Sequence, residues 1–200
     1  AVAFELYPYM EPATVRAAFP EVQTMDFDTA IGYVVKAGLS CMPTGVRKVA
    51  VAHAFLAGGR ETDSERPLSV GGSSYISPAY FSSFSYTAMG HLHNMQSAGA
   101  DNIRYSGSLL KYSFAEAGQK KGMMLVDIDA VGQVKMEEVS FVPHHEVQRV
   151  RGFLSEIVSD RHSYPLSEAY TLVELLDKEA VLDAYGKLEN LQQTIEKQKK

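Results

Sequence analysis

The sequence predicts an α/β fold, because strand-like and helix-like segments alternate along its 200 residues. Short runs rich in β-branched and aromatic residues, such as 46–52 and 86–89, are typical of strands. The stretch 28–36 carries apolar residues at helical spacing. Hydrophobic residues make up 46% of the chain and charged residues 22%, which is the balance of a globular protein and argues against disorder as the main state.

The N-terminal part predicts one strand and two helices. We expect a strand over 4–9, a short helix from Pro12 to Pro20, and a second helix over 28–36. Asp26 or Asp28 would cap the second helix, and Gly38 would end it.

The middle of the chain predicts three strands around a long loop. The strand 46–52 ends at His53, and the strand 86–89 runs into Gly90-His91-Leu92-His93. A third strand is expected over 103–105. The Gly-, Ser- and Pro-rich segment between the first two strands, 57–83, is long enough to suggest a functional loop.

The C-terminal part predicts a hairpin and then a smaller unit. The hairpin joins 123–129 to 134–142 through a turn at Gly132. After Pro143 the pattern changes to a strand over 146–151, a helix over 153–158, a strand over 170–176 and a helix from Lys178. The apolar positions of that last helix are expected in a core: Val181, Leu182, Tyr185, Leu188, Leu191 and Ile195. We therefore expect one domain over 1–143 and part of another over 144–200.

Composition excludes several classes of protein. No apolar run approaches the roughly 18 residues needed to span a bilayer, and the first residues lack the basic start of a signal peptide. The single cysteine, Cys41, excludes an internal disulfide and a cysteine-based zinc site, and it suits a reducing compartment such as the cytoplasm. The net charge of −5 is not that of a protein that grips nucleic acid by charge alone.

Three histidines stand where strands end. His53, His91 and His93 would project into the loops above a sheet, where sites are usually built. In an extended segment residues i and i+2 point the same way, so His91 and His93 could face one point, and Gly90 would let the backbone turn closely. Three imidazoles suit zinc, manganese or iron; the alternative is that each is a hydrogen-bonded surface residue. The other histidines, His144, His145 and His162, are expected to be solvated.

Four segments carry a family resemblance: VAHAFLAGG, SERPLSVGG, GHLH and YSGSLLKYSFAE. From about Phe4 to Leu188 the chain resembles the SbcD-type nuclease subunits, which are calcineurin-like metallophosphoesterases. The resemblance implies part of a β-sandwich with flanking helices, followed by a small α/β capping domain.

The same resemblance implies a function. The family's nucleases carry two metal ions, typically manganese, and hydrolyse phosphodiesters, as a double-strand exonuclease and a single-strand endonuclease. It also implies a homodimer that works on DNA with the SMC-like ATPase SbcC in repair, recombination and replication in the cytoplasm. By this resemblance His53 and His91 hold one metal, and His93 helps to hold the other.

The chain also departs from the family. The three motifs that come first in the family, D-x-H, G-D-x-x-D and G-N-H-D/E, do not stand ahead of His53. The sequence therefore resembles an internal fragment that begins within the catalytic domain. We expect no catalytic residue in it, an absent or incomplete metal site, and no activity of the isolated chain.

Further residues are candidates for contacting DNA. Arg60 and Arg66 flank the charged ETDSER segment and could bind phosphate, or else belong to a solvated turn. Ser106 and Ser108 flank Gly107, which allows close approach of a substrate or simply makes a tight turn. Lys111 could line the DNA path.

Three functions remain open from the sequence. The first is a metal-dependent DNA nuclease subunit. The second is another calcineurin-like phosphodiesterase or phosphatase. The third is a catalytically inactive module. The SERPLSVGG and YSGSLLKYSFAE segments favour the first.

Overall fold

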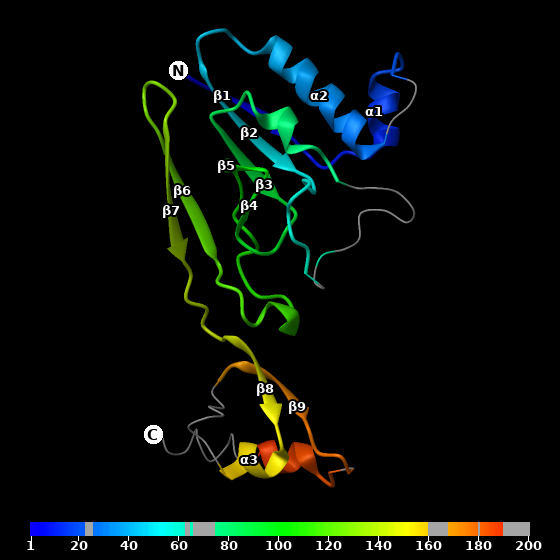
Figure 1. Ribbon diagram of the computed structural model, residues 1–200, viewed down its shortest axis with the longest axis vertical. Coiled ribbons are helices and arrows are strands. Elements are labelled where there is room, and N and C mark those ends of the chain that lie inside the picture. Colours follow the sequence, from blue (N-terminus) through cyan, green and yellow to red (C-terminus); the bar gives the residue numbers. More distant parts are fainter. Residues whose placement is uncertain (23–25, 63–64, 66–74, 160–167, 180, 190–200) are drawn as a thin grey trace. The chain divides into compact units, whose positions relative to one another are not determined.

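A computed structural model describes residues 1–22, 26–62, 65, 75–159, 168–179 and 181–189 (Figure 1). The chain forms two compact units, one of residues 1–110 and 120–142, the other of residues 111–119 and 143–200. The predicted mixed α/β fold is confirmed, with parallel and antiparallel strands and flanking helices. None of the described helices is long and apolar enough to cross a membrane.

The first unit is built on a five-stranded sheet in the order β1-β2-β3-β5-β4. Its first four strands run parallel, and β4 is antiparallel to β5. The bounds are β1 Val2–Tyr7, β2 Arg47–His53, β3 Tyr86–Gly90, β4 Gln96–Ala98 and β5 Ala100–Tyr105. The short β4 was not predicted, because three polar and small residues give no strand pattern.

Two helices accompany this sheet: one packs on its core through Ile31 and Val35, and the other packs against that helix (Figure 1). They are α1, Pro12–Ala18, and α2, Phe27–Cys41. Asp26 caps α2, as one of the two predicted alternatives: its carboxylate accepts the Thr29 amide at 2.8 Å, and the Thr29 hydroxyl accepts the Asp26 amide at 3.2 Å.

The prediction that Gly38 ends α2 is wrong, because the helix continues to Cys41. A Cβ at Gly38 would lie 2.5 Å from the Glu5 carboxylate and 2.9 Å from the Tyr7 hydroxyl. The glycine therefore allows close packing of α2 on β1, and it sits inside the helix for that reason rather than as a cap.

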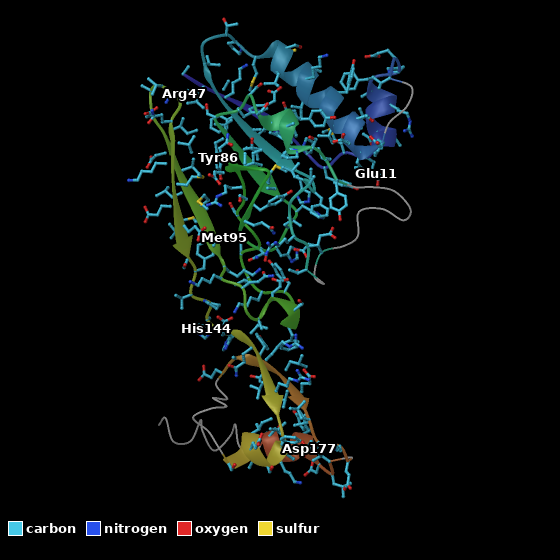
Figure 2. All side chains as sticks on the ribbon, viewed as in Figure 1. Glu11, Arg47, Tyr86, Met95, His144 and Asp177 are labelled. Atoms are coloured by element: carbon cyan, nitrogen blue, oxygen red, sulfur yellow. The ribbon has the colours of Figure 1, made fainter. Side chains whose placement is uncertain are left out.

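The opposite face of the sheet meets the predicted hairpin, formed by β6, Gly122–Ile128, and β7, Val134–Ser140. The Arg47 guanidinium donates to the carbonyls of Ile128 and Asp129, at 2.8 and 2.7 Å. Figure 2 shows the labelled Arg47 beside the turn of the hairpin. The core of this unit lies around the sheet and consists of Tyr7, Ile31, Val35, Ala50, Ala52, Ala54, Phe55, Leu56, Ile76, Phe81, Phe84, Met89, Leu92, Ala98, Ile103 and Tyr105.

The second unit is smaller. Its parallel strands are β8, Val147–Gly152, and β9, Tyr170–Leu175, with α3, Leu154–Ser159, between them in sequence. Residues 184–189 are helical. The expectation that the last helix buries all its apolar positions is wrong for Leu182 and Tyr185, which are 85% and 77% exposed. Of the others, Leu188 packs on the small core of this unit, and Leu191 and Ile195 lie outside the described residues.

Candidate metal centre

His53 and His91 lie together at the ends of two neighbouring parallel strands. His53 is the last residue of β2, and His91 directly follows β3. The register pairs His53 with Gly90, so the two strands end at the same level. The centroids of the two imidazole rings are 5.6 Å apart, with the rings inclined at 76°. The parallel sheet thus brings two potential metal ligands together from positions far apart in the sequence.

Gly90 makes room for the His53 ring. A Cβ at this position would lie 2.9 Å from Nδ1 of His53. The sequence-based reason for this glycine, a close backbone turn, is therefore incomplete: what any larger residue would displace is the neighbouring imidazole. The glycine of the G-H-x-H motif therefore makes room for the imidazole of His53 on the neighbouring strand, in addition to allowing the backbone to turn before His91.

The backbone leaves its extended conformation at His91, where φ is 116°. Residues other than glycine rarely adopt positive φ, and such residues are often found at functional sites. The extended backbone expected from His91 to His93, which was the reason for both rings to face one way, is consequently wrong. β3 ends at Gly90, and the residues after it bend.

The surroundings of His91 keep its imidazole neutral. Burial lowers the pKa of His91 below its ordinary value of 6.5, the nearby His53 and His93 lower it further, and the Glu65 carboxylate opposes them. Nε2 of His91 is buried and has no hydrogen-bond partner among the described residues. A neutral imidazole with an unpartnered ring nitrogen is the form in which histidine binds a metal ion.

The Tyr105 hydroxyl holds the backbone beyond His53. Tyr105 is fully buried in β5, donates to the Ala54 carbonyl at 2.7 Å and accepts the Leu56 amide at 2.9 Å. Burial raises the pKa of Tyr105 far above its ordinary value, so the hydroxyl stays protonated and can donate. This side chain therefore fixes the path of the chain as it leaves the His53 strand end.

The backbone of His93 is held by charged side chains. Its amide donates to Oε1 of Glu65 at 2.8 Å, and its carbonyl accepts Nζ of Lys121 at 2.7 Å and the Ser108 amide at 3.0 Å. Glu65 and Lys121 are 9% and 6% exposed. Met95, labelled in Figure 2, lies two residues further along the same segment.

Glu65 is held in its charged form. Burial alone would raise its pKa, but hydrogen bonds from the Thr62 hydroxyl and from the amides of His93 and Thr62 outweigh that effect and lower it. Its Oε2 accepts both the amide and the hydroxyl of Thr62, at 2.5 and 2.6 Å. The carboxylate is therefore an anion at neutral pH, joined to two segments of the backbone.

These residues fit a metal held by imidazole ligands, and fit one held by carboxylates less well. The two adjacent rings and the unpartnered Nε2 of His91 are suitable ligands for zinc or iron, whereas manganese prefers oxygen. Glu65 uses both carboxylate oxygens in hydrogen bonds. Within the described parts of the chain there is no group of three His, Cys, Asp or Glu side chains arranged to hold a metal.

The structure describes four of the five predicted DNA-contacting residues. Arg60 is exposed, and its backbone pairs with the Gln96 side chain at 2.8 and 2.9 Å. Arg66 lies outside the described residues. Ser106 is half-buried directly after β5, and the Ser108 hydroxyl donates to the Leu110 carbonyl at 2.8 Å.

Lys111 belongs to the second unit, where its ammonium pairs with Glu146 at 2.8 Å and donates to the Ala117 carbonyl at 2.8 Å. The histidines predicted to be solvated include His144 and His145, which are exposed, and His162, which lies outside the described residues.

Sequence reasoning missed three residues of this site: Glu65, Lys121 and Tyr105. Charge made Glu65 and Lys121 resemble surface residues, and only their burial separates them from neighbours such as Glu61 and Lys120. The D-x-H spacing does occur once in the chain, at Asp160, Arg161 and His162. These residues follow the other histidine motifs instead of preceding them and lie outside the described residues.

Comparison with known proteins supports the resemblance found in the motifs. No family model matches the chain. The chain is 27% identical over 190 residues to the SbcD component of the SbcCD nuclease of Staphylococcus epidermidis. The match covers 95% of this chain and 51% of the relative, so the chain spans about half the length of the curated relative it matches. The predicted resemblance is thereby confirmed: over nearly its whole length this chain is similar to an SbcD-type nuclease subunit.

Proposed function

We propose that the protein, in its full natural length, is a metal-dependent DNA nuclease subunit of the SbcD type. The observation that carries this proposal is the pairing of His53 and His91, 5.6 Å apart at adjacent strand ends, with a buried and unpartnered ring nitrogen on His91. The relative's name, which denotes a nuclease subunit, supports the same reaction class. Residues 1–143 would form part of the nuclease domain and 144–200 part of a capping domain.

The three histidines have separate roles in this proposal. His53 and His91 would hold one divalent metal, and His93 would help to hold a second. Manganese, the family's usual ion, would need carboxylate ligands in addition to these imidazoles. Bound metal ions would lower the pKa of the attacking water and offset charge on the phosphodiester. The low pKa of His91 keeps its ring unprotonated for this task at neutral pH. The carboxylate motifs of the family do not precede His53, so we expect residues 1–200 alone to lack the activity.

The proposed substrate is DNA, cut as a double-strand exonuclease and a single-strand endonuclease in repair, recombination and replication. The net charge of −5 repels a polyanion, so local contacts must offset it. Arg60, Arg66, Ser106, Ser108 and Lys111 are the proposed phosphate contacts. The proposed partners are an SbcC-type ATPase and a second copy of the same subunit, acting in the cytoplasm.

The test compares substrates and variants in the full-length protein. With Mn²⁺ added, linear duplex DNA should be degraded, whereas a phosphomonoester such as p-nitrophenyl phosphate should be a poor substrate. His53→Ala and His91→Ala should each lower nuclease activity by orders of magnitude with little change in thermal stability, because both rings stand at a strand end. His144→Ala, which alters an exposed histidine of the second unit, is the matched control and should leave activity intact.

Two results would contradict the proposal. Efficient phosphomonoester hydrolysis without DNA cleavage would favour a phosphatase. Absence of every metal-dependent hydrolysis in the folded full-length protein would favour an inactive module.

A further inference from the structure

The G-H-x-H segment is held by two buried side chains of opposite charge that reach it from different parts of the chain. Glu65 stands in the loop after β2, and Lys121 stands immediately before β6. They meet the two peptide groups of one residue: the carboxylate accepts the His93 amide at 2.8 Å, and the ammonium donates to the His93 carbonyl at 2.7 Å. Each charge is thus placed against the complementary pole of a peptide dipole.

The carboxylate is itself fixed. Its second oxygen accepts the Thr62 amide and the Thr62 hydroxyl, so Glu65 cannot rotate without breaking two further hydrogen bonds. The ammonium is fixed in the same way, because Nζ of Lys121 also donates to the Ser108 hydroxyl at 2.8 Å. Charged groups are rarely this buried unless they are fully hydrogen-bonded, and hydrogen bonds to ions are roughly twice as strong as neutral ones.

The turn at Gly107 also supports the backbone of His93. Gly107 has φ +79°, and a Cβ there would lie 2.7 Å from the His93 carbonyl oxygen. That close approach lets the Ser108 amide reach the same carbonyl at 3.0 Å. The backbone at His93 needs such support, because His91, two residues before it, adopts a positive φ that an isolated chain would avoid.

We infer that Glu65 and Lys121 are positioning residues for His93: they fix the peptide groups on both sides of it and thereby set the direction of its imidazole in the metal site. This inference rests on the proposed function, in which His93 is a ligand. Neither residue needs to touch metal or substrate. Outer residues that orient metal ligands typically contribute about 10–100-fold to metal affinity.

The test measures Co²⁺ affinity of the full-length protein from the visible absorption of the bound ion, with Co²⁺ alone as the probe. Glu65→Gln and Lys121→Met should each weaken Co²⁺ binding about 10-fold. The chain offers matched controls in the exposed neighbours of each residue, Glu61→Gln and Lys120→Met, which should bind Co²⁺ as the parent protein does. Hydrogen exchange of the His93 amide gives a readout that needs no metal, and it should be faster in Glu65→Gln than in Glu61→Gln.

A milder variant covers the case in which Glu65→Gln does not fold. Thr62→Val keeps the Glu65 charge but removes the hydroxyl that donates to it, and it should weaken Co²⁺ binding by a few-fold and speed exchange of the His93 amide.

The outcomes separate this inference from the proposed function. If His93→Ala weakens Co²⁺ binding while Glu65→Gln, Lys121→Met and Thr62→Val bind normally, the positioning role is overturned and the metal site stands. If His93→Ala binds Co²⁺ as tightly as the parent protein does, the role of His93 in the proposed function is overturned, and the positioning inference with it. Loss of thermal stability at unchanged Co²⁺ affinity also overturns the inference, because it would show that the two charges only stabilise the fold.

Discussion

The centre and the β1 edge of the same sheet are built differently. In β3, at the centre, Tyr86, Thr87 and Met89 are at most 5% exposed, so the strand is covered on both faces. In β1, at the edge, Phe4 and Leu6 are 63% and 70% exposed and point away from the helix-covered face. The two proposed ligands of one metal differ accordingly: His91 follows the covered β3 and is half-buried, whereas His53 ends β2, in which Val51 is 41% exposed, and is itself exposed. The β1 side carries an apolar row that nothing in the described residues covers.

The largest effect is expected at Tyr105, on the covered side. Tyr105→Phe removes a hydroxyl that satisfies the Ala54 carbonyl and the Leu56 amide, and should lower the free energy of unfolding by about 2–4 kcal/mol. Urea denaturation measures it. Tyr75→Phe, at a tyrosine 48% exposed, is the control and should change stability little. Equal stability of the two variants would mean that the covered side does not depend on this link.

A smaller effect is expected at Gly90. Gly90→Ala places a Cβ 2.9 Å from Nδ1 of His53 and should cost about 1–3 kcal/mol while displacing the ring. Combining it with His53→Ala should recover most of the loss, because the clash partner is then gone. Gly118→Ala, where a Cβ meets nothing within 4 Å, is the control. A loss that persists in the double variant would place the strain in the backbone.

The main elements and the pair of histidines could be predicted from the sequence, whereas the roles of several single residues could not. The β2 and β3 strands, the hairpin and the pairing of His53 with His91 follow from local patterns, since parallel strands that end together bring their next residues together. The prediction for Gly38 was wrong and the reason given for Gly90 was incomplete, because the sequence alone does not show whether a glycine ends a helix, bends a chain or makes room for a neighbouring side chain. The roles of Glu65 and Lys121 depend on burial by distant segments, which no local pattern encodes.

The pH dependence of stability should report on His91. In the folded chain its pKa lies below 6.5, whereas the unfolded chain has the ordinary value, so below pH 6.5 the unfolded state binds more protons. Stability should therefore be constant above that pH with respect to this group and fall as the pH drops below it. Urea unfolding with a chelator present, from about pH 7.5 to about pH 5, should show a shallower fall in His91→Gln than in the parent chain. Identical slopes would show that the ring is not protected from protonation.

The smallest effect on stability, and the largest on association, is expected on β1. An exposed apolar row at a sheet edge favours contact with another molecule, so the chain of residues 1–200 should self-associate at high concentration. Phe4→Ser together with Leu6→Ser should reduce that association, as measured by light scattering, with a change in unfolding free energy of less than about 1 kcal/mol because both side chains are mostly in water already. Val131→Ser changes an apolar residue that is 80% exposed at the hairpin turn, and it should leave association unchanged.

A parent chain that stays monomeric at high concentration would contradict this interpretation of β1. If Val131→Ser reduces association as strongly as the β1 substitutions do, association depends on exposed apolar surface in general. The difference between the edge and the centre of the sheet would then not explain self-association.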